Sequence, residues 1–443
     1  MSLKVGFVML ANPAESGGER APELLAGAVK SLEAAGVEVV AYRDLIEVPS
    51  QAIAAAEMMN EADVDSIVVM LVTWALDSLE YIFTSMVKVP ATYWAIPYTE
   101  TFSIGCIQHY GSVLKALGYS YQYVYGLPGD KEVADDIVTY AKVGRAVKEC
   151  AKMKIALVGP RQTWRVAGPQ DMSREEWDFS KKTGVTFIHL EMEDIMDRAE
   201  EYSDEEAKEA LSRLLRRSGK VAASEEAMIY MAKMYLASKA VMEENHLTNI
   251  AAECYPNYGG LMNLTSSWMA DEGVYVDTEG DLSHTFVINI MNSLAGGGVT
   301  ALGEAGSFDS ERNIVSMAHE GSTAMSLAGD LTRTQINPSG ERGTFVGVPV
   351  KAMDEVTICS MVGNGGNYKI FVAKARTLEV TYDEWVAGGS KLIVNLQFDV
   401  PAKEALDRMM DAGMDHHLLL KEGDYTKEMK AFCDYMGFEV VTL

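Results

Sequence analysis

The sequence predicts an α/β protein: two doubly wound parallel-sheet domains followed by a mostly antiparallel, barrel-like β domain. Two observations carry this prediction. Short apolar runs alternate with helical patterns, and the alternation starts again near residue 152. From about residue 340, β-branched runs follow one another with Gly-rich turns between them. We therefore expect domains at 1–151, 152–295 and 296–443.

The first domain is predicted from a regular alternation of strands and helices. Short buried runs that helical periodicity separates are typical of βαβ units, whose strands pair in parallel. The predicted strands are 4–10, 37–42, 66–71 and 92–95, and the predicted helices are 20–35, 50–61, 76–86 and 132–151.

The second domain repeats this texture. A strand at 154–160 ends at Gly-Pro, and a charged helix and a long Met- and Ala-rich helix follow. The predicted strands are 154–160, 185–190, 248–252 and 274–277, and the predicted helices are 203–216 and 224–243.

The last third has few helical patterns. Its β-branched runs, bounded by Gly-rich turns, are typical of an antiparallel sheet or barrel. They are 344–350, 355–361, 369–378 and 392–400. We expect a short α/β tail at 403–443 to close the chain.

Charge and cysteine usage narrow the class of protein. The formal net charge of −26 disfavours nucleic acid and anionic membranes, which bind clustered Lys and Arg. The apolar stretch 67–76 is too short to span a bilayer, and the first apolar run is a strand rather than a signal peptide. The five cysteines contain no C-x-x-C pair, which argues against a disulfide framework or a thiolate zinc site. These features predict a soluble, cytoplasmic protein.

Two adjacent histidines, His416 and His417, precede a short apolar run. Neighbouring residues on a strand point to opposite faces, so we expect one imidazole to bind a ligand and the other to pack or form a hydrogen bond. The sequence leaves open which one binds.

Two carboxylates follow buried segments upstream. Glu279 comes after the predicted strand 274–277, where parallel sheets place ligands. Asp281 is better explained as the N-cap of the next helix, but Glu279 precedes the cap and has no such structural role. Glu304 ends a strand predicted at 296–304, one helix later, although a surface loop is the alternative for it. We expect both glutamates at the same edge of one sheet.

His319 has small neighbours and is either a hydrogen-bonded core residue or a further ligand. Two carboxylates with one or two imidazoles suit a divalent ion that prefers oxygen and nitrogen. Paired carboxylates also suit proton transfer. The sequence therefore predicts a metal site that includes Glu279 and Glu304.

Other candidates have strong structural alternatives. Trp74, at the end of the third strand, suits either stacking on a sugar or core packing. The loop 11–20, which ends at Arg20, lacks the spacing of a phosphate-binding loop, so a turn is preferred. The run 254–256, Cys-Tyr-Pro, indicates a strand end rather than a nucleophile.

In their order, these segments resemble the L-fucose/L-arabinose isomerase superfamily, and more closely its fucose-isomerase-like branch. The segments are Ala-Glu-Cys-Tyr-Pro at 252–256, Thr-Glu-Gly-Asp at 278–281, Glu304, His319, and the His pair with Lys-Glu-Gly-Asp at 421–424. In that family a strand ending in Cys-Trp-Pro precedes an acidic Glu-x-Asp motif, and here Tyr255 replaces the Trp. The match covers most of 250–424.

The resemblance implies roles for particular residues. Glu279 and Glu304 would be catalytic and bind Mn²⁺ or another divalent ion, with His417 as the C-terminal ligand, His416 as its alternative and His319 as a further ligand.

The resemblance also implies a shared site in a homotrimer or homohexamer. Trp74, and with it Arg20, would reach the sugar from a neighbouring subunit.

The expected activity is a metal-dependent aldose–ketose isomerase acting on a free sugar of the fucose or arabinose type. One alternative is a non-catalytic sugar-binding or regulatory protein on the same fold, which bound metal would disfavour. Another is an isomerase for a modified sugar, such as a sulfonated or branched one, which only the pocket lining distinguishes.

Overall fold

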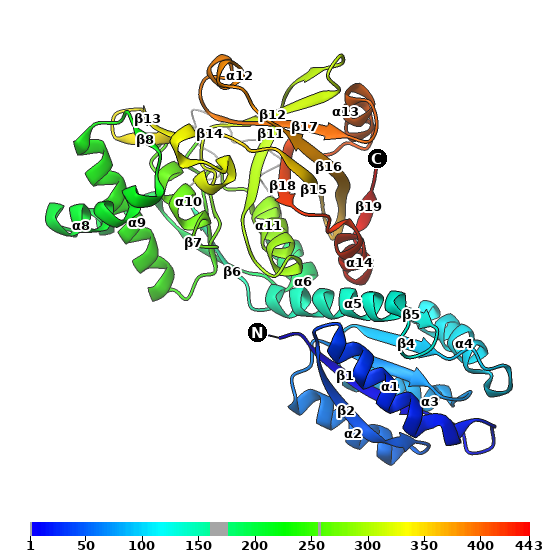
Figure 1. Cartoon of the computed structure of the whole chain (residues 1–443). Helices are drawn as coiled ribbons and strands as arrows, with labels where there is room; N and C mark the ends of the chain where they lie inside the picture. Colours follow the sequence, from blue (N-terminus) through cyan, green and yellow to red (C-terminus); the bar gives the residue numbers. More distant parts are fainter. Residues whose placement is uncertain (1, 160–175, 256–257) are drawn as a thin grey trace. The chain divides into compact units, whose positions relative to one another are not determined.

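The computed structural model describes residues 2–159, 176–255 and 258–443 (Figure 1). Pro160 and Pro256, which belong to two of the motifs above, lie outside the described residues. The chain forms two compact units. Unit 1 comprises residues 1–149 and 430–437, and unit 2 comprises residues 150–429 and 438–443. The three-domain division with boundaries after 151 and 295 stays a prediction.

Unit 1 is built on a five-stranded parallel sheet in the order β2-β1-β3-β4-β5. From β1 the chain first adds β2 on one side and then β3, β4 and β5 on the other, so the strand order reverses between β1 and β3. Open α/β sheets bind ligands at the carboxyl ends of the strands beside such a reversal. The strands are β1 Lys4–Leu10, β2 Glu38–Ile46, β3 Ser66–Leu71, β4 Ala91–Ala95 and β5 Gln122–Tyr125. The helices are α1 Ala21–Ala34, α2 Pro49–Glu61, α3 Asp77–Met86, α4 Ser103–Ala116 and α5 Lys131–Cys150, together with the part of α14 Thr426–Met436 that follows residue 429.

The sequence prediction missed α4 and β5. Helix α4 contains Gly105 and Gly111, and glycine weakens the helical signal. Gly111 has a packing role, because a Cβ there would lie 2.1 Å from the Tyr121 hydroxyl.

Unit 2 starts with a four-stranded parallel sheet in the order β10-β9-β6-β7, so both predicted parallel sheets are confirmed. The strands are β6 Lys154–Val158, β7 Thr186–Leu190, β9 Asn249–Ala252 and β10 Val276–Asp277. The helices are α6 Glu176–Thr183, α7 Met192–Glu200, α8 Asp204–Leu214, α9 Glu225–Glu244, α10 Asn263–Ala270 and α11 Leu282–Leu294.

The rest of unit 2 is a ten-stranded, mostly antiparallel sheet, as predicted. An extra pairing between β16 and β17 closes six of its strands into a ring, in the order β16-β15-β18-β11-β12-β17. The strands are β8 Lys220–Val221, β11 Thr300–Asp309, β12 Ile314–His319, β13 Gln335–Ser339, β14 Gly343–Pro349, β15 Met353–Asn364, β16 Asn367–Leu378, β17 Leu392–Phe398, β18 His417–Glu422 and β19 Glu439–Val441. Two helices accompany them, α12 Tyr382–Ala387 and α13 Ala402–Asp411.

The α/β tail expected at 403–443 is present as α13, β18, α14 and β19, and its strand β18 lies between β15 and β11 within the ring. One local prediction was wrong. Strand β11 starts at Thr300 rather than at 296, since Gly296, Gly297 and Gly298 have positive φ values of 74°, 119° and 89° and turn the chain after α11. Glu304 therefore lies inside β11, in a different sheet from the strand before Glu279.

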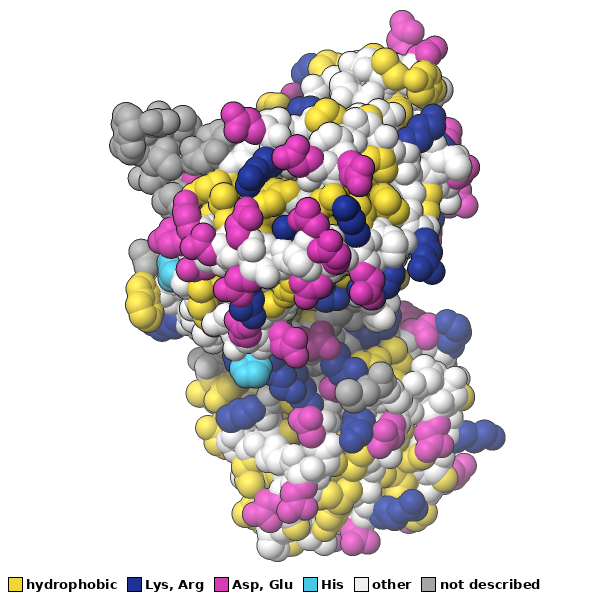
Figure 2. Space-filling view, turned by 90° about the vertical axis from the view of Figure 1, so that its left-hand side faces the viewer, with side chains coloured by type: hydrophobic (Ala, Val, Ile, Leu, Met, Phe, Trp, Pro, Cys, Tyr) yellow, Lys and Arg dark blue, Asp and Glu magenta, His cyan; other side chains and the backbone are white. Residues whose placement is uncertain are grey.

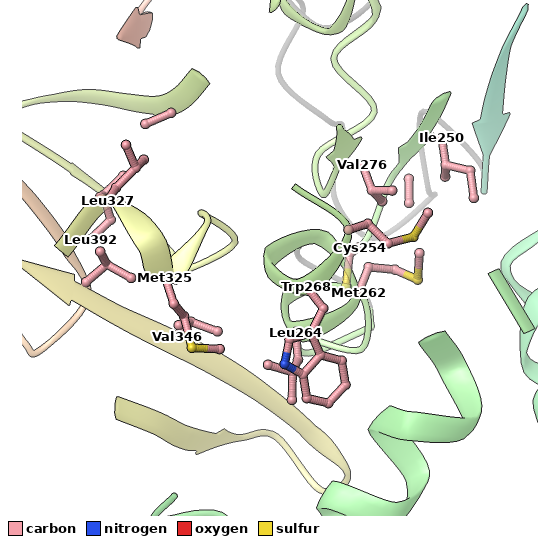
Figure 3. Close-up of a cluster of buried hydrophobic side chains, with 14 of the residues drawn as sticks. Ile250, Cys254, Met262, Leu264, Trp268, Val276, Met325, Leu327, Val346 and Leu392 are labelled. Atoms are coloured by element: carbon pink, nitrogen blue, oxygen red, sulfur yellow. The ribbon is translucent and has the colours of Figure 1, made fainter. Parts of the chain in front are cut away.

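A continuous apolar core supports unit 2. Figure 3 shows Cys254 and Met262 below Val276 of β10, and the Trp268 ring beside Leu264. Burying a large apolar side chain stabilises the fold by about 1.5–3 kcal/mol, so these contacts fix the strands that lead into the Glu279 turn.

All five cysteines are buried thiols, and burial raises the pKa of Cys254 to about 11.

The surface reflects the acidic composition. Asp and Glu side chains are spread over the face drawn in Figure 2, with Lys and Arg side chains between them. Among the described residues, no helix combines the length and the apolar character needed to cross a membrane.

Candidate metal centre

The turn between β10 and α11 places the central carboxylate. The Asp277 carboxylate accepts hydrogen bonds from the backbone N–H groups of Glu279 (2.9 Å) and Asp281 (2.8 Å). Gly280 has φ 74°, a left-handed conformation, and its N–H donates to the Ala252 carbonyl at 3.1 Å. These bonds tie the turn to the end of β9 and hold the backbone of Glu279 in place.

Asp281 caps α11, as the sequence predicts. Its Oδ1 accepts a hydrogen bond from the backbone N–H of His284 at 2.9 Å, and the carboxylate is fully buried. Because the first N–H groups of a helix lack partners within the helix, this bond fixes where α11 begins.

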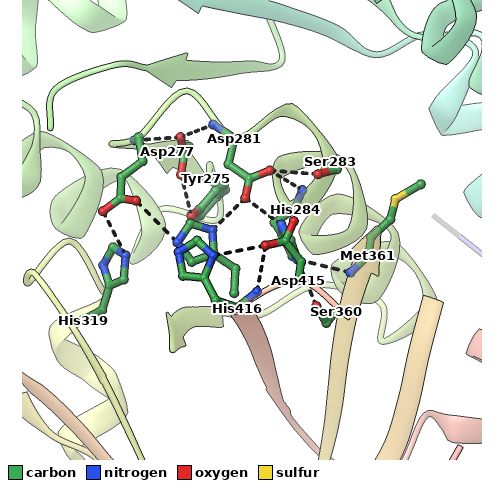
Figure 4. Close-up of polar contacts among 12 residues, drawn as sticks. Tyr275, Asp277, Asp281, Ser283, His284, His319, Ser360, Met361, Asp415 and His416 are labelled. Carbon is green, nitrogen blue, oxygen red and sulfur yellow. Dashed lines mark hydrogen bonds and ion pairs between the residues drawn. The ribbon is translucent and has the colours of Figure 1, made fainter. Parts of the chain in front are cut away.

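Three residues from distant parts of unit 2 meet at the end of this turn. Glu279 Oε1 lies 3.3 Å from His319 Nε2, and Glu279 Oε2 lies 3.4 Å from His417 Nε2. His319 comes from the end of β12 and His417 from the start of β18. Ligand atoms of the three residues lie within 4.8 Å of one another, which is close enough to share one ion. Figure 4 shows His319 beside the turn that carries Asp277 and Asp281.

The ionisable side chains of the group stabilise one another's charged forms. Burial opposes ionisation of Glu279, but the neighbouring imidazoles of His319 and His417 outweigh it and hold its pKa well below the usual range. Burial likewise disfavours a charged His417, yet Asp281 and Glu279 raise its pKa well above the ordinary value. Burial raises the pKa of Asp277 to about 7, helped by the charge of Asp281. The centre therefore keeps an ionised carboxylate between two imidazoles.

The residues present fit a divalent ion. His319 is 5% exposed, and neither of its ring nitrogens forms a hydrogen bond with a residue that the structure describes. Buried polar atoms in this state are uncommon and call for an explanation. Nε2 of His319 faces Glu279 Oε1 at 3.3 Å without forming a well-aligned hydrogen bond, so an ion between the two atoms would serve both, and imidazole with carboxylate is a common donor set for divalent metals.

The adjacent histidines differ in burial, but strand alternation is not the reason: His416 precedes β18, and the two ring centroids lie 4.1 Å apart. His417 is buried and faces Glu279, whereas the His416 side chain is 43% exposed and lies 3.1 Å from Asp415. His417 is thus the member of the pair in the three-residue group.

Glu304 is not in this group, and its side chain is exposed. It lies directly opposite His417 in the register of β11 and β18. Directly opposite residues of antiparallel strands extend from the same face, with Cβ atoms roughly 5 Å apart. Glu304 is therefore a solvent-exposed neighbour of His417. The expectation that Glu279 and Glu304 lie at the same edge of one sheet was wrong, because their strands belong to different sheets.

Sequence reasoning missed His284 and Asp277. His284 Nδ1 lies 2.6 Å from Asp281 Oδ2, which places a second imidazole behind His417. A signal was available, since His284 is three residues after the cap Asp281 and a cap side chain reaches that position.

Trp74 and Arg20 lie near the carboxyl ends of the unit 1 strands. Trp74 is partly buried, and its ring centroid is 6.4 Å from that of His109. The Arg20 guanidinium lies 4.5 Å from the centroid of the Tyr98 ring and donates a 2.5 Å hydrogen bond to Glu100. Both side chains therefore have neighbours within unit 1.

Comparison with known proteins gives distant relatives. No family model matches the chain. A protein of Priestia aryabhattai named sulfoquinovose isomerase is 24% identical over 324 residues, covering 72% of this chain and 70% of the relative. Proteins with the same name from Alkalicoccus urumqiensis (22% identity, 75% and 74% coverage) and Clostridium sp. strain MSTE9 (23% identity, 74% and 73% coverage) also match.

The similarity to a solved structure is too weak to indicate a shared fold. A solute-binding protein of an ABC transporter from Burkholderia multivorans matches at 15% identity over 67% of this chain and 93% of that chain, with a TM-score of only 0.20. The chain is thus a distant homologue of proteins named sulfoquinovose isomerase.

Proposed function

We propose that this protein is a metal-dependent aldose–ketose isomerase whose substrate is a sulfonated hexose of the sulfoquinovose type. The observation that carries the proposal is the Glu279 carboxylate held between Nε2 of His319 and Nε2 of His417. The substrate class comes from the names of the distant relatives, which favour the modified-sugar alternative over a fucose- or arabinose-type sugar.

Glu279, His319 and His417 would hold Mn²⁺ or another divalent ion, and Glu304 would join them from the adjacent strand position. When bound, such an ion polarises a sugar carbonyl and lowers the pKa of the neighbouring hydroxyl.

The two glutamates would carry out the proton transfer. One carboxylate takes the proton from carbon 2 of the open-chain aldose, and the electron pair left behind forms an enediol. The other glutamate, as the acid, donates a solvent-derived proton to carbon 1 while the O2 hydroxyl proton passes to O1, and the first carboxylic acid releases its proton to solvent. The aldehyde thereby becomes CH₂OH and carbon 2 becomes a ketone. General acid–base catalysis of this kind contributes about 10²–10⁴-fold.

Arg20 and Trp74 would complete the site from a neighbouring subunit. Trp74 offers an aromatic surface for the apolar face of the sugar. Arg20 offers a guanidinium for the sulfonate, since planar N–H donors pair well with oxyanions. The guanidinium already faces Glu100 at 2.5 Å and Glu19 at 3.6 Å, so a sulfonate would have to compete with these two carboxylates.

The test is turnover by the purified chain with Mn²⁺. Sulfoquinovose, glucose, L-fucose and L-arabinose would be supplied separately in D₂O, and ketose formation followed by NMR. We expect the sulfonated ketose, deuterium at carbon 1, loss of activity with EDTA and recovery with Mn²⁺. Mn²⁺ binding without ketose from any of the four sugars would overturn the proposal in favour of a sugar-binding protein.

A further inference from the structure

A second cluster lies directly behind the proposed metal site. Asp281, His284 and His417 also bring ligand atoms within 4.8 Å of one another, and all three side chains are buried. His417 belongs to both groups, so the hydrogen-bond donors and acceptors decide which group can hold an ion.

His284 has no nitrogen left for an ion. Its Nε2 lies 3.1 Å from the backbone nitrogen of Met361, and a backbone N–H can only donate. Nε2 of His284 is therefore the acceptor, so the ring proton is on Nδ1. That proton is donated to Asp281 Oδ2 at 2.6 Å. Ser360 Oγ, 3.3 Å from Nε2, adds a second contact on the acceptor side.

Asp281 has all its acceptor positions filled. Oδ1 accepts from the Ser283 hydroxyl (3.0 Å) and the His284 backbone N–H (2.9 Å). Oδ2 accepts from Nδ1 of His284 (2.6 Å) and faces Nδ1 of His417 at 2.7 Å. A carboxylate that can only accept requires a proton on Nδ1 of His417. Nε2 of His417, which faces Glu279, is then the nitrogen that an ion would bind, with release of the second proton of the imidazolium.

We propose that Asp281, itself oriented by His284, is a positioning residue that fixes the proton of His417 on Nδ1 and directs Nε2 at the metal. The inference rests on the metal site of the proposed function. The cluster of Asp281, His284 and His417 therefore orients a ligand of the metal site and does not bind a second ion. Carboxylates that hold the far nitrogen of a ligating histidine typically contribute about 10- to 100-fold to metal affinity.

Asp281→Asn tests the inference with little change of shape. Asn caps a helix as well as Asp does, so α11 keeps its start. The amide NH₂, however, is a donor that faces two N–H groups, which favours moving the His417 proton to Nε2, where it blocks the ion. We expect Mn²⁺ to bind about 10- to 100-fold more weakly. Free Mn²⁺ would be measured by EPR in titrations without sugar, and thermal melts in EDTA would check folding.

Asp277→Asn is the matched control. Asp277 is a buried carboxylate in the same turn, and its oxygen accepts two backbone N–H bonds that an amide oxygen can keep. Its carboxylate bonds to the backbone of the turn and to the Tyr275 hydroxyl rather than to His284 or His417, so the change leaves the proton of His417 in place. We expect a much smaller loss of Mn²⁺ affinity than for Asp281→Asn.

A second pair keeps the test decisive if Asp281→Asn does not fold. His284→Asn retains an N–H donor near the position of Nδ1, whereas His284→Leu removes it. We expect His284→Asn to bind Mn²⁺ clearly more tightly than His284→Leu.

Mn²⁺ affinity of Asp281→Asn within about threefold of the wild type, below the usual contribution of such hydrogen bonds, would overturn the inference. Equal affinities for the two His284 variants would do the same. Because these titrations contain no sugar, a failure of the proposed isomerase activity leaves their result unaffected.

Discussion

Glu279 is the residue on which the proposed chemistry depends most. Its carboxylate lies between two imidazoles from β12 and β18 and is kept ionised by them. Glu279→Gln keeps the shape of the side chain but removes its charge, so we expect weaker metal binding and slower proton transfer.

We expect Glu279→Gln to lower kcat by at least about 10²–10⁴-fold and to weaken Mn²⁺ binding, and Glu304→Gln to lower kcat over the same range. Steady-state kinetics and Mn²⁺ titration measure the two effects. Glu311→Gln, a change at an exposed acid after β11, is the control and should resemble the wild type. Near-normal kcat in both Glu279→Gln and Glu304→Gln would remove these residues from the mechanism.

Unit 1 contains a buried acid that gives its own pH dependence. Glu80 is fully buried and accepts a 3.0 Å hydrogen bond from the Cys106 thiol. Burial raises its pKa from 4.5 to about 8. Between these values the folded state keeps a proton that the unfolded chain has lost, so stability falls as pH rises from about 4.5 and levels off above about 8.

Glu80→Gln should remove this dependence, because the amide is neutral and its oxygen still accepts from Cys106. We expect the variant to gain stability over the wild type between pH 5 and pH 9, by up to roughly 5 kcal/mol from a shift of this size. Urea denaturation at several pH values measures the difference. Parallel pH profiles for the two proteins would contradict the assignment.

At the level of elements, the order of the strands in the ring determines which residues meet at the proposed metal site. Strand β18 follows β17 and α13 along the chain but lies between β15 and β11 in the sheet. That position brings His417 opposite Glu304 and beside the turn before α11. The local sequence of β18 shows an apolar run, but its neighbours in the sheet come from distant segments.

Two helical glycines in unit 1 allow a test of packing between elements. A Cβ on Gly144 of α5 would lie 1.8 Å from the Asp65 carbonyl oxygen, whereas a Cβ on Gly105 of α4 would meet nothing within 4 Å. We expect Gly144→Ala to destabilise the protein by about 1–3 kcal/mol or more through overpacking. Gly105→Ala should stabilise it by about 0.5–1 kcal/mol, since alanine favours helices.

Chemical denaturation of the two glycine variants beside the wild type measures both effects. The opposite signs are the informative result, because helix propensity alone would make both substitutions stabilising. A stabilised Gly144→Ala variant would show that α5 does not approach Asp65 this closely.

At the scale of the whole molecule, the proposed site needs residues from both units. Trp74 and Arg20 belong to unit 1, and Glu279, Glu304 and His417 belong to unit 2. We propose that a neighbouring subunit of a homotrimer or homohexamer supplies the first two.

Subunit exchange tests this arrangement. Mixing Trp74→Ala with Glu279→Gln should restore part of the activity, because some sites then combine two intact halves. Mixing Glu279→Gln with Glu304→Gln should restore no activity. Both substitutions lie in unit 2, so every site in the mixed oligomer still carries one of them. No recovery in the first mixture after verified exchange, or a monomer at working concentration, would contradict the shared site.

The sequence by itself determined the fold class and several local features. Apolar periodicity predicted both parallel sheets and the antiparallel strands, because alternation of burial is a property of each segment. The cap at Asp281 was likewise predictable, since capping involves residues only three apart.

Only the tertiary structure decided how the candidate residues meet. It selected His417 over His416, placed Glu304 inside β11, and put Asp281 and His284 behind the proposed ligand. These outcomes depend on the register of β11 against β18 and on the closure of the ring by β16 and β17. Such pairings join segments far apart in the chain, and the energy that selects among them comes from packing the whole barrel rather than from any local pattern.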